Sequence, residues 1–80
     1  MKVQVLFFGA TADAVGEREI EIDLPGETKA EAAFQKILAE YPSLANHKLL
    51  FAVNQEYSTG GGETLKNGDE LAVFTAVSGG

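Results

Sequence analysis

The last residues of the sequence are the ones whose types could support chemistry. A stretch typical of a buried strand, Ala72–Val77, is followed by Ser78 and then by the pair Gly79–Gly80. Because glycine has no side chain, this pair leaves the terminal carboxylate unhindered on a thin length of backbone. Such a carboxylate could enter a neighbouring protein's active site through a tunnel that admits only glycine. The alternative interpretation is a frayed terminus, which glycine also tolerates.

The length of this terminal segment fits a delivery role. Extended at about 3.3–3.6 Å per residue, the segment from Thr75 to Gly80 spans on the order of 20 Å, enough to reach from a docked domain into a partner. We therefore expect a folded domain over residues 1–75 and a separate tail over residues 76–80.

Other residues that could support chemistry have simpler explanations. Carboxylates recur at every second position from Glu17 to Asp23, a spacing typical of the solvated face of a strand. The single histidine, His47, lies in a polar loop and is expected at the surface. The segment Thr59–Lys66 is rich in glycine but lacks the phosphate-loop pattern, since Lys66 is followed by Asn67. We see no nucleophile with a base and an orienting group, and predict that the chain is not an enzyme on its own.

Composition narrows the classes of partner. The 80 residues contain 12 acidic and 6 basic side chains, for a net charge of −6, and no cysteine. Such a surface repels nucleic-acid phosphates and favours basic partners. No apolar stretch is long enough to cross a membrane. The N-terminal MKVQVLFFGATA imitates a signal peptide, but Gln4 interrupts it and its removal would delete the first strand, so we expect a cytoplasmic protein.

Hydrophobic periodicity predicts an α+β fold of β-β-α-β-β order. A helix is expected from a capping box at Thr28–Glu31, with its apolar stripe running to Tyr41, and Pro42 stops it. A short helical turn closed by Gly16 is also expected. The predicted strands cover residues 2–8, 19–24, 48–54 and 70–77, with a short extra strand near 55–58. The first and last strands should be central, adjacent and parallel in a mixed sheet, with the helix packed on one face.

This arrangement leaves apolar side chains on the wrong face of the sheet. If Val3, Val5 and Phe7 point to the helix, then Leu6 and Phe8 point away from it, because side chains alternate along a strand. Phe74 should join them from the last strand. An exposed patch of this kind marks a protein interface.

Four stretches together resemble the family of molybdopterin synthase small subunits. The members of this family are ubiquitin-like sulfur carriers of the β-grasp fold. These are LFFG at 6–9, LLFAVNQE at 49–56, LKNGDELAVF at 65–74 and VSGG at 77–80. The resemblance covers essentially the whole chain, and the combination is specific although each stretch alone is weak. The order of elements expected from periodicity agrees with it.

The resemblance implies a mechanism in which the chain is a co-substrate. An ATP-using adenylyltransferase, similar to the enzymes that activate ubiquitin, would adenylate Gly80. A sulfur donor such as a cysteine desulfurase or a rhodanese would then convert the acyl-adenylate to a thiocarboxylate. The tail would enter the large synthase subunit, in an expected heterotetramer, and donate sulfur to the dithiolene of molybdopterin. ATP and Mg²⁺ would belong to the activating partner, and this chain would bind no cofactor or metal.

The resemblance also assigns residues. Gly79 and Gly80 match the family's terminal pair, and Phe74 matches an aromatic residue that packs against the large subunit. The resemblance implies further apolar contacts with the partner from Phe8 and Tyr57, and Val77 and Ser78 are also expected to bind it. One departure is the pair Thr75–Ala76, where the family often has two prolines.

Related functions remain open at this stage. A carrier supplying sulfur for thiamine thiazole or for tRNA thiolation would share the fold and the Gly-Gly end. A ubiquitin-like modifier joined to lysines and a plain interaction domain are two further alternatives.

Overall fold

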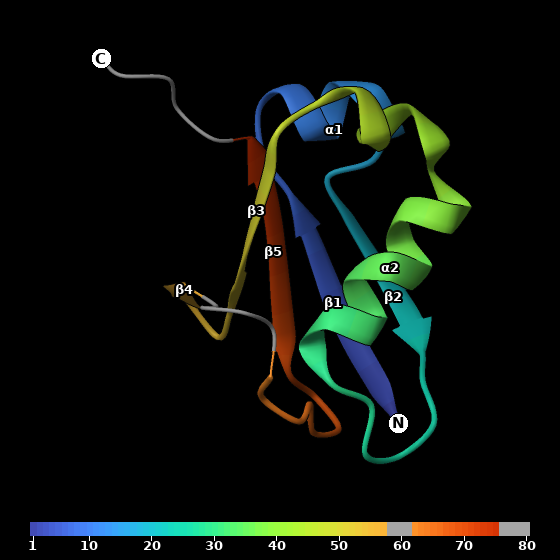
Figure 1. The fold of residues 1–80 in the computed structure, drawn as a ribbon, viewed down its shortest axis with the longest axis vertical. Helices are drawn as coiled ribbons and strands as arrows, with labels where there is room; N and C mark the ends of the chain where they lie inside the picture. The colour runs from blue at the N-terminus through green and yellow to red at the C-terminus, as the bar shows by residue number, and fades with distance from the viewer. Residues whose placement is uncertain (58–61, 76–80) are drawn as a thin grey trace.

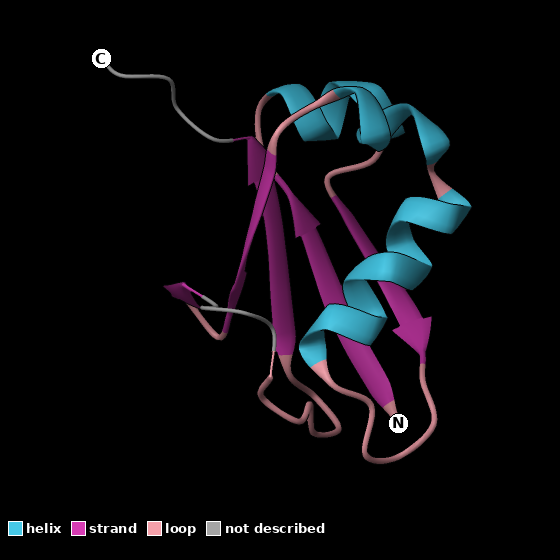
Figure 2. Cartoon of the chain, in the orientation of Figure 1, coloured by secondary structure: helices cyan, strands magenta, loops and turns pink. Residues whose placement is uncertain are grey.

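The computed structural model describes residues 1–57 and 62–75, which form one mixed sheet with helices on one face (Figures 1 and 2). In the described residues the elements follow one another along the chain as β1 (Lys2–Phe7), α1 (Ala10–Val15), β2 (Glu19–Asp23), α2 (Ala30–Glu40), the 3₁₀ helix η1 (Pro42–Asn46), β3 (Leu49–Val53), β4 (Glu56–Tyr57) and β5 (Glu70–Thr75).

The sheet has the order β2-β1-β5-β3-β4. β1 and β5 are parallel at its centre, whereas β1 with β2, β3 with β5 and β3 with β4 are antiparallel. The prediction of adjacent, parallel first and last strands is therefore confirmed. Because β1 and β5 are parallel, both end at the same edge of the domain, where α1 lies (Figure 1).

The core fills the space between the sheet and α2. Val3 and Val5 of β1 and Leu71 and Val73 of β5 are fully buried there, as alternation along the two central strands predicted. α2 contributes its predicted stripe, with Ala33 and Ile37 buried and Phe34, Leu38 and Tyr41 packed against the cluster. The rings of Phe34 and Phe51 stack with centroids 4.7 Å apart, and Tyr41 meets Phe7 edge-on at 5.9 Å.

The predicted capping box at the start of α2 is wrong. The helix begins at Ala30, Lys29 holds the N-cap position, and no side chain caps the first turn. The Thr28 hydroxyl instead donates a hydrogen bond to the carbonyl of Pro25 at 2.6 Å. The neighbouring segment takes over part of the capping role, since the Ala30 N–H donates to the carbonyl of Glu63 at 2.9 Å.

Turns and strand ends agree with the sequence to within a residue or two. α1 ends at Gly16, whose φ of +82° is the left-handed conformation that glycine adopts cheaply. The extra strand near 55–58 is β4, joined to β3 by Asn54 and Gln55, both of which have positive φ, as in the tight turns of hairpins. The last predicted strand is observed to Thr75; its final positions, 76 and 77, lie outside the described residues.

Candidate functional site

The face of the sheet opposite α2 carries exposed apolar side chains. Phe8 and Leu50 are the large hydrophobic residues that the described structure leaves most open, at 52% and 42% exposure. In the strand register Leu50 pairs with Phe74, and Leu6 pairs with Ala72. Leu6, Phe8, Leu50 and Phe74, hereafter the apolar patch, therefore lie across β1, β5 and β3 on one face. Leu6 and Phe74 of the predicted trio lie on this face but are half-buried, and Phe8, the residue after β1, is its exposed member.

Leu50 is the member that sequence reasoning missed. It lies in β3, where Leu50 alternates with Phe51, and the ring of Phe51 packs on the helix side against Phe34. Pairing β3 with β5 in antiparallel register would have placed Leu50 beside Phe74, because opposite residues share a face. The position of Leu50 could therefore be deduced from the sequence only once β3 was known to be the neighbour of β5.

Thr11 holds the end of β1, the start of α1 and the end of β5 together. Its side chain is fully buried. The hydroxyl oxygen lies 2.8 Å from the carbonyl oxygens of both Phe8 and Val73, so its single proton serves this pair, and it accepts the Phe8 N–H at 3.0 Å. These bonds fix the backbone of Phe8 and of the residue just before Phe74, and so position the apolar patch. Nothing in the sequence pattern singled Thr11 out.

Replacing Thr11 with valine should destabilise the domain measurably. Valine keeps the shape but removes the hydroxyl, whose hydrogen bonds contribute about 0.5–1.5 kcal/mol each. The Phe8 N–H and the carbonyls of Phe8 and Val73 then keep only their longer backbone bonds, of 3.2 and 3.3 Å. Urea unfolding of Thr11→Val measures the loss. Thr11→Ser is the matched control, because it keeps the hydroxyl and loses only a methyl group, worth about 0.8 kcal/mol. A larger loss in Thr11→Ser than in Thr11→Val would contradict this role for the hydroxyl.

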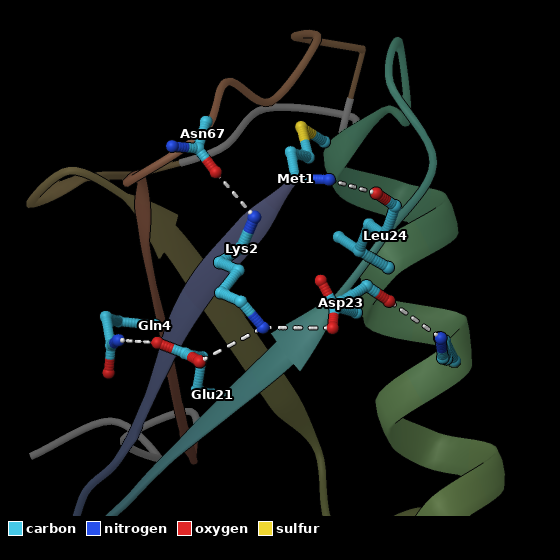
Figure 3. Close-up of polar contacts among 8 residues, drawn as sticks. Met1, Lys2, Gln4, Glu21, Asp23, Leu24 and Asn67 are labelled. Carbon is cyan, nitrogen blue, oxygen red and sulfur yellow. Dashed lines mark hydrogen bonds and ion pairs between the residues drawn. The ribbon is translucent and has the colours of Figure 1, made fainter.

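The other end of the open face is polar (Figure 3). The Lys2 ammonium lies 3.0 Å from Asp23 and 3.5 Å from Glu21, and the Gln4 amide donates to Glu21 at 2.9 Å. The hydrogen bond and charge of Lys2 lower the pKa of Asp23 below its ordinary value of 3.8. The same pairing raises the pKa of Lys2 above its ordinary 10.5, with Glu21 adding to the effect. These groups are solvent-exposed, so their contribution is screened and small.

The pairing sets a pH window for its contribution. Because the pKa of Asp23 is lowered in the folded state, its contribution to the free energy of unfolding is fully present above the ordinary value of 3.8. This contribution is lost as the pH falls through the lowered pKa of Asp23. Because the pKa of Lys2 is raised in the folded state, its stabilising contribution is fully present below 10.5. This contribution is lost as the pH rises through the raised pKa of Lys2. Asp23→Asn should therefore lower the free energy of unfolding slightly at pH 7.

Chemical denaturation of Asp23→Asn at neutral and strongly acidic pH checks this window, with Glu19→Gln on the same strand as the control. The difference between Asp23→Asn and the parent should shrink as the pH falls below 3.8 and through the lowered pKa of Asp23. A difference that persists unchanged into acid would show that the charge of Asp23 is not its cause.

The structure describes only some of the predicted site residues. Phe8 and Phe74 lie on the open face. Tyr57 pairs with Ala52 in the β3–β4 ladder, and only its backbone is described. The predicted tail 76–80, with Val77, Ser78, Gly79 and Gly80, lies outside the described residues.

The remaining candidates are surface groups where the structure describes them. Glu19, Glu21, Asp23 and His47 are exposed, as predicted. Residues 58–61 of the glycine-rich segment are not described. Among residues 1–57 and 62–75, no group of three or more His, Cys, Asp or Glu side chains is arranged to hold a metal. No helix in that same part of the chain is long and apolar enough to cross a membrane.

A mixed sheet with a parallel central pair, covered by a helix on one face and open on the other, is the arrangement of ubiquitin-like β-grasp domains, as the sequence predicted. One solved structure of this kind is SAMP1 from Haloferax volcanii, which superposes with a TM-score of 0.86 at 26% identity over the full length of both chains.

The chain belongs to the ThiS family, which it matches over residues 5–80. It is 39% identical over 83 residues to the molybdopterin synthase sulfur carrier subunit of Homo sapiens, covering 99% of this chain and 94% of that protein. A complex of subunits 1 and 2 of molybdopterin-converting factor from Helicobacter pylori contains a chain that is similar over the full length of both, with a TM-score of 0.73 and 26% identity.

Proposed function

We propose that the chain is the sulfur carrier subunit of a molybdopterin synthase and works as a co-substrate rather than as a catalyst. The observation that supports this most strongly is the full-length similarity to the human sulfur carrier subunit, at 39% identity. The apolar patch gives the proposal a physical basis, since it offers a docking surface next to the end of β5. The reactive group we propose is the carboxylate of Gly80.

The chemistry assigned to Gly80 follows from the properties of carboxylates. A carboxylate is a poor electrophile because its oxygen is a poor leaving group. Transfer of AMP from ATP to this oxygen, with release of pyrophosphate, turns it into a good one. A sulfur nucleophile then attacks the carbonyl carbon, and the bond to AMP breaks as the C–S bond forms. The proposal gives ATP, Mg²⁺ and the catalytic groups to the activating partner, and none of them to this chain.

The proposal assigns docking to the partner and delivery of the sulfur to two different parts of the chain. We assign the apolar patch to the contact with a large synthase subunit, with Tyr57, Val77 and Ser78 as further contacts. The Helicobacter pylori complex of subunits 1 and 2 supports a partner of this kind. From Thr75 the tail would span on the order of 20 Å, and Gly79–Gly80 would present the carboxyl group inside that partner. The assembly would be a heterotetramer in the cytoplasm.

Reconstitution tests the assignment to molybdopterin. The thiocarboxylated chain should convert the sulfur-free pyranopterin precursor to the dithiolene when mixed with its large subunit, with a stoichiometric return of the carboxylate form. Thiazole synthase, a tRNA thiolase and lysine-bearing acceptor proteins are the comparison reactions. Turnover in one of those, with none in the large-subunit reaction, would replace this proposal with the corresponding alternative.

A further inference from the structure

The turn that leads into β5 contains an Asn-Gly pair, Asn67–Gly68, and both residues are exposed. Two bonds between Lys66 and Asp69 close this turn. The Asp69 N–H donates to the Lys66 carbonyl at 3.0 Å, and the Lys66 N–H donates to the Asp69 carboxylate at 2.8 Å. Gly68 has a φ of +87°, a conformation that favours glycine. The fold therefore requires glycine directly after Asn67.

An asparagine that precedes glycine can react with its own backbone. The glycine amide nitrogen, after losing its proton to solvent, attacks the side-chain carbon Cγ of the asparagine. The N–Cγ bond forms, the side-chain nitrogen takes up a proton and leaves as ammonia, and a succinimide ring results. Water then opens the ring at either carbonyl, which yields aspartate or isoaspartate. Glycine permits this attack because it has no side chain to hinder it. Asn46 precedes histidine and Asn54 precedes glutamine, so Asn67 is the asparagine suited to this reaction.

The backbone of one residue, Lys2, holds both reacting groups. The Gly68 N–H donates to the Lys2 carbonyl at 2.7 Å, and the Lys2 N–H donates to Oδ1 of Asn67, also at 2.7 Å (Figure 3). These two contacts are hereafter the Lys2 bonds. Bonded pairs alternate along an antiparallel ladder, and the Leu24 N–H donates to Met1. The backbone groups of Lys2 are therefore directed away from β2 and toward the turn.

The Lys2 bonds oppose ring closure at both reacting groups. The Lys2 carbonyl accepts the proton that the Gly68 nitrogen has to lose, so this bond must break before the nitrogen can attack. The Lys2 N–H restrains the Asn67 side chain, which has to rotate to bring its Cγ to that nitrogen. The turn is held to β1 by a further bond, from the Gln4 N–H to the Asp69 carbonyl at 2.9 Å. Ring closure therefore requires a local opening of the turn away from β1, which costs less than global unfolding.

We propose that Asn67 is a site of spontaneous deamidation, through attack by the Gly68 nitrogen, and that the Lys2 bonds slow this reaction in the folded chain. Deamidation adds one negative charge to the net charge of −6. The aspartate product keeps an oxygen that can accept the Lys2 N–H. The isoaspartate product inserts an extra carbon atom into the backbone before β5, displaces Gly68 from the Lys2 carbonyl and so weakens the attachment of the turn to β1. The proposal does not depend on the sulfur-carrier function.

Mass spectrometry of the folded full chain during incubation at mildly alkaline pH tests the proposal. The peptide LKNGDEL, which repeats residues 65–71 and has no Lys2 to bond to, is the unprotected reference in the same buffer. Fragmentation should locate the reaction of the chain at Asn67, with Asn46 and Asn54 as internal references. The product should contain isoaspartate as well as aspartate, because a succinimide opens to both. The folded chain should react at least several-fold more slowly than the peptide.

Two substitutions of Lys2 separate its backbone bond from its side chain. Lys2→Pro removes the N–H that holds Asn67, at the first residue of a strand, where proline is tolerated. It should raise the deamidation rate of the folded chain about 2- to 10-fold, the change in an opening equilibrium that one hydrogen bond produces. Lys2→Ala removes the ion pairs with Glu21 and Asp23 but keeps the N–H, so the parent rate should persist.

Solvent exchange of the Leu24 amide, which bonds to Met1, should be unchanged in both variants if β1 stays paired with β2. Where Lys2→Pro loosens that pairing, the comparison of the folded parent with LKNGDEL decides. The proposal is overturned if Asn67 stays intact, if the folded chain reacts as fast as the peptide, or if aspartate is the only product. Equal rates for Lys2→Pro and Lys2→Ala, with the Leu24 amide still protected, would overturn it as well.

Discussion

Adding one alanine after Gly80 should lower the rate of sulfur loading by about 100-fold or more, since a misplacement of about 1 Å already costs that much in an oriented reaction. The extra residue moves the terminal carboxylate by about 3.3–3.6 Å. It also puts an unreactive peptide bond where the carboxylate of Gly80 would stand. The measurement is the rate of thiocarboxylate formation with the activating enzyme, ATP and a sulfur donor.

The matched control adds the same residue elsewhere. Gly62 is exposed and lies outside the helices and strands. An alanine inserted beside Gly62 adds the same mass but leaves the terminus intact, so loading should proceed at the parent rate. Both variants should unfold at the parent's temperature. Unchanged loading of the chain extended after Gly80 would mean that the reactive group is not its carboxylate.

Truncating Phe74 to alanine should raise the dissociation constant for the large subunit roughly 30-fold, the effect of losing an aromatic interface residue worth about 2 kcal/mol. Phe74 lies on the open face of β5, opposite Leu50 and adjacent to the end of the described strand. Because its side chain is only half-buried, the free energy of unfolding should change less than the binding energy. Calorimetric titration with the purified large subunit measures the loss.

Phe51→Leu is the control for this experiment. Phe51 lies one position from Leu50 on β3 but packs on the helix side, where its ring stacks on Phe34. Its replacement should cost about 0.5–1.5 kcal/mol of ring pairing and leave binding unchanged. If Phe74→Ala reduced stability more than affinity, or if Phe51→Leu weakened binding as much as Phe74→Ala, the apolar patch would not be the interface.

The fold was predictable because its signals are periodic. Polar and apolar residues alternate strictly in β2, and buried residues alternate along β1 and β5. This alternation determines which face of each strand meets the helix, and on the two central strands that face carries Val3, Val5, Leu71 and Val73. The stripe on α2 supplies the other half of the core. Two apolar strands at opposite ends of the sequence are best buried next to each other, which predicts the parallel pair at the centre.

The features that were missed depend on contacts between distant segments. The buried hydroxyl of Thr11 matters because it meets the Val73 carbonyl, 62 positions along the chain. The capping box failed because the backbone at Glu63 supplies an acceptor at the start of α2. Leu50 joins the apolar patch only through its pairing with β5. Local sequence patterns contain no information about such partners.

The most direct test of the account is the intact mass of the chain after incubation with its activating enzyme, ATP, Mg²⁺ and a sulfur donor. The account predicts the mass gain that replacement of one oxygen by sulfur produces, located by fragmentation at Gly80 and absent when ATP is omitted. An unchanged mass with its own activating enzyme and donor, or the added sulfur at any position other than Gly80, would contradict it.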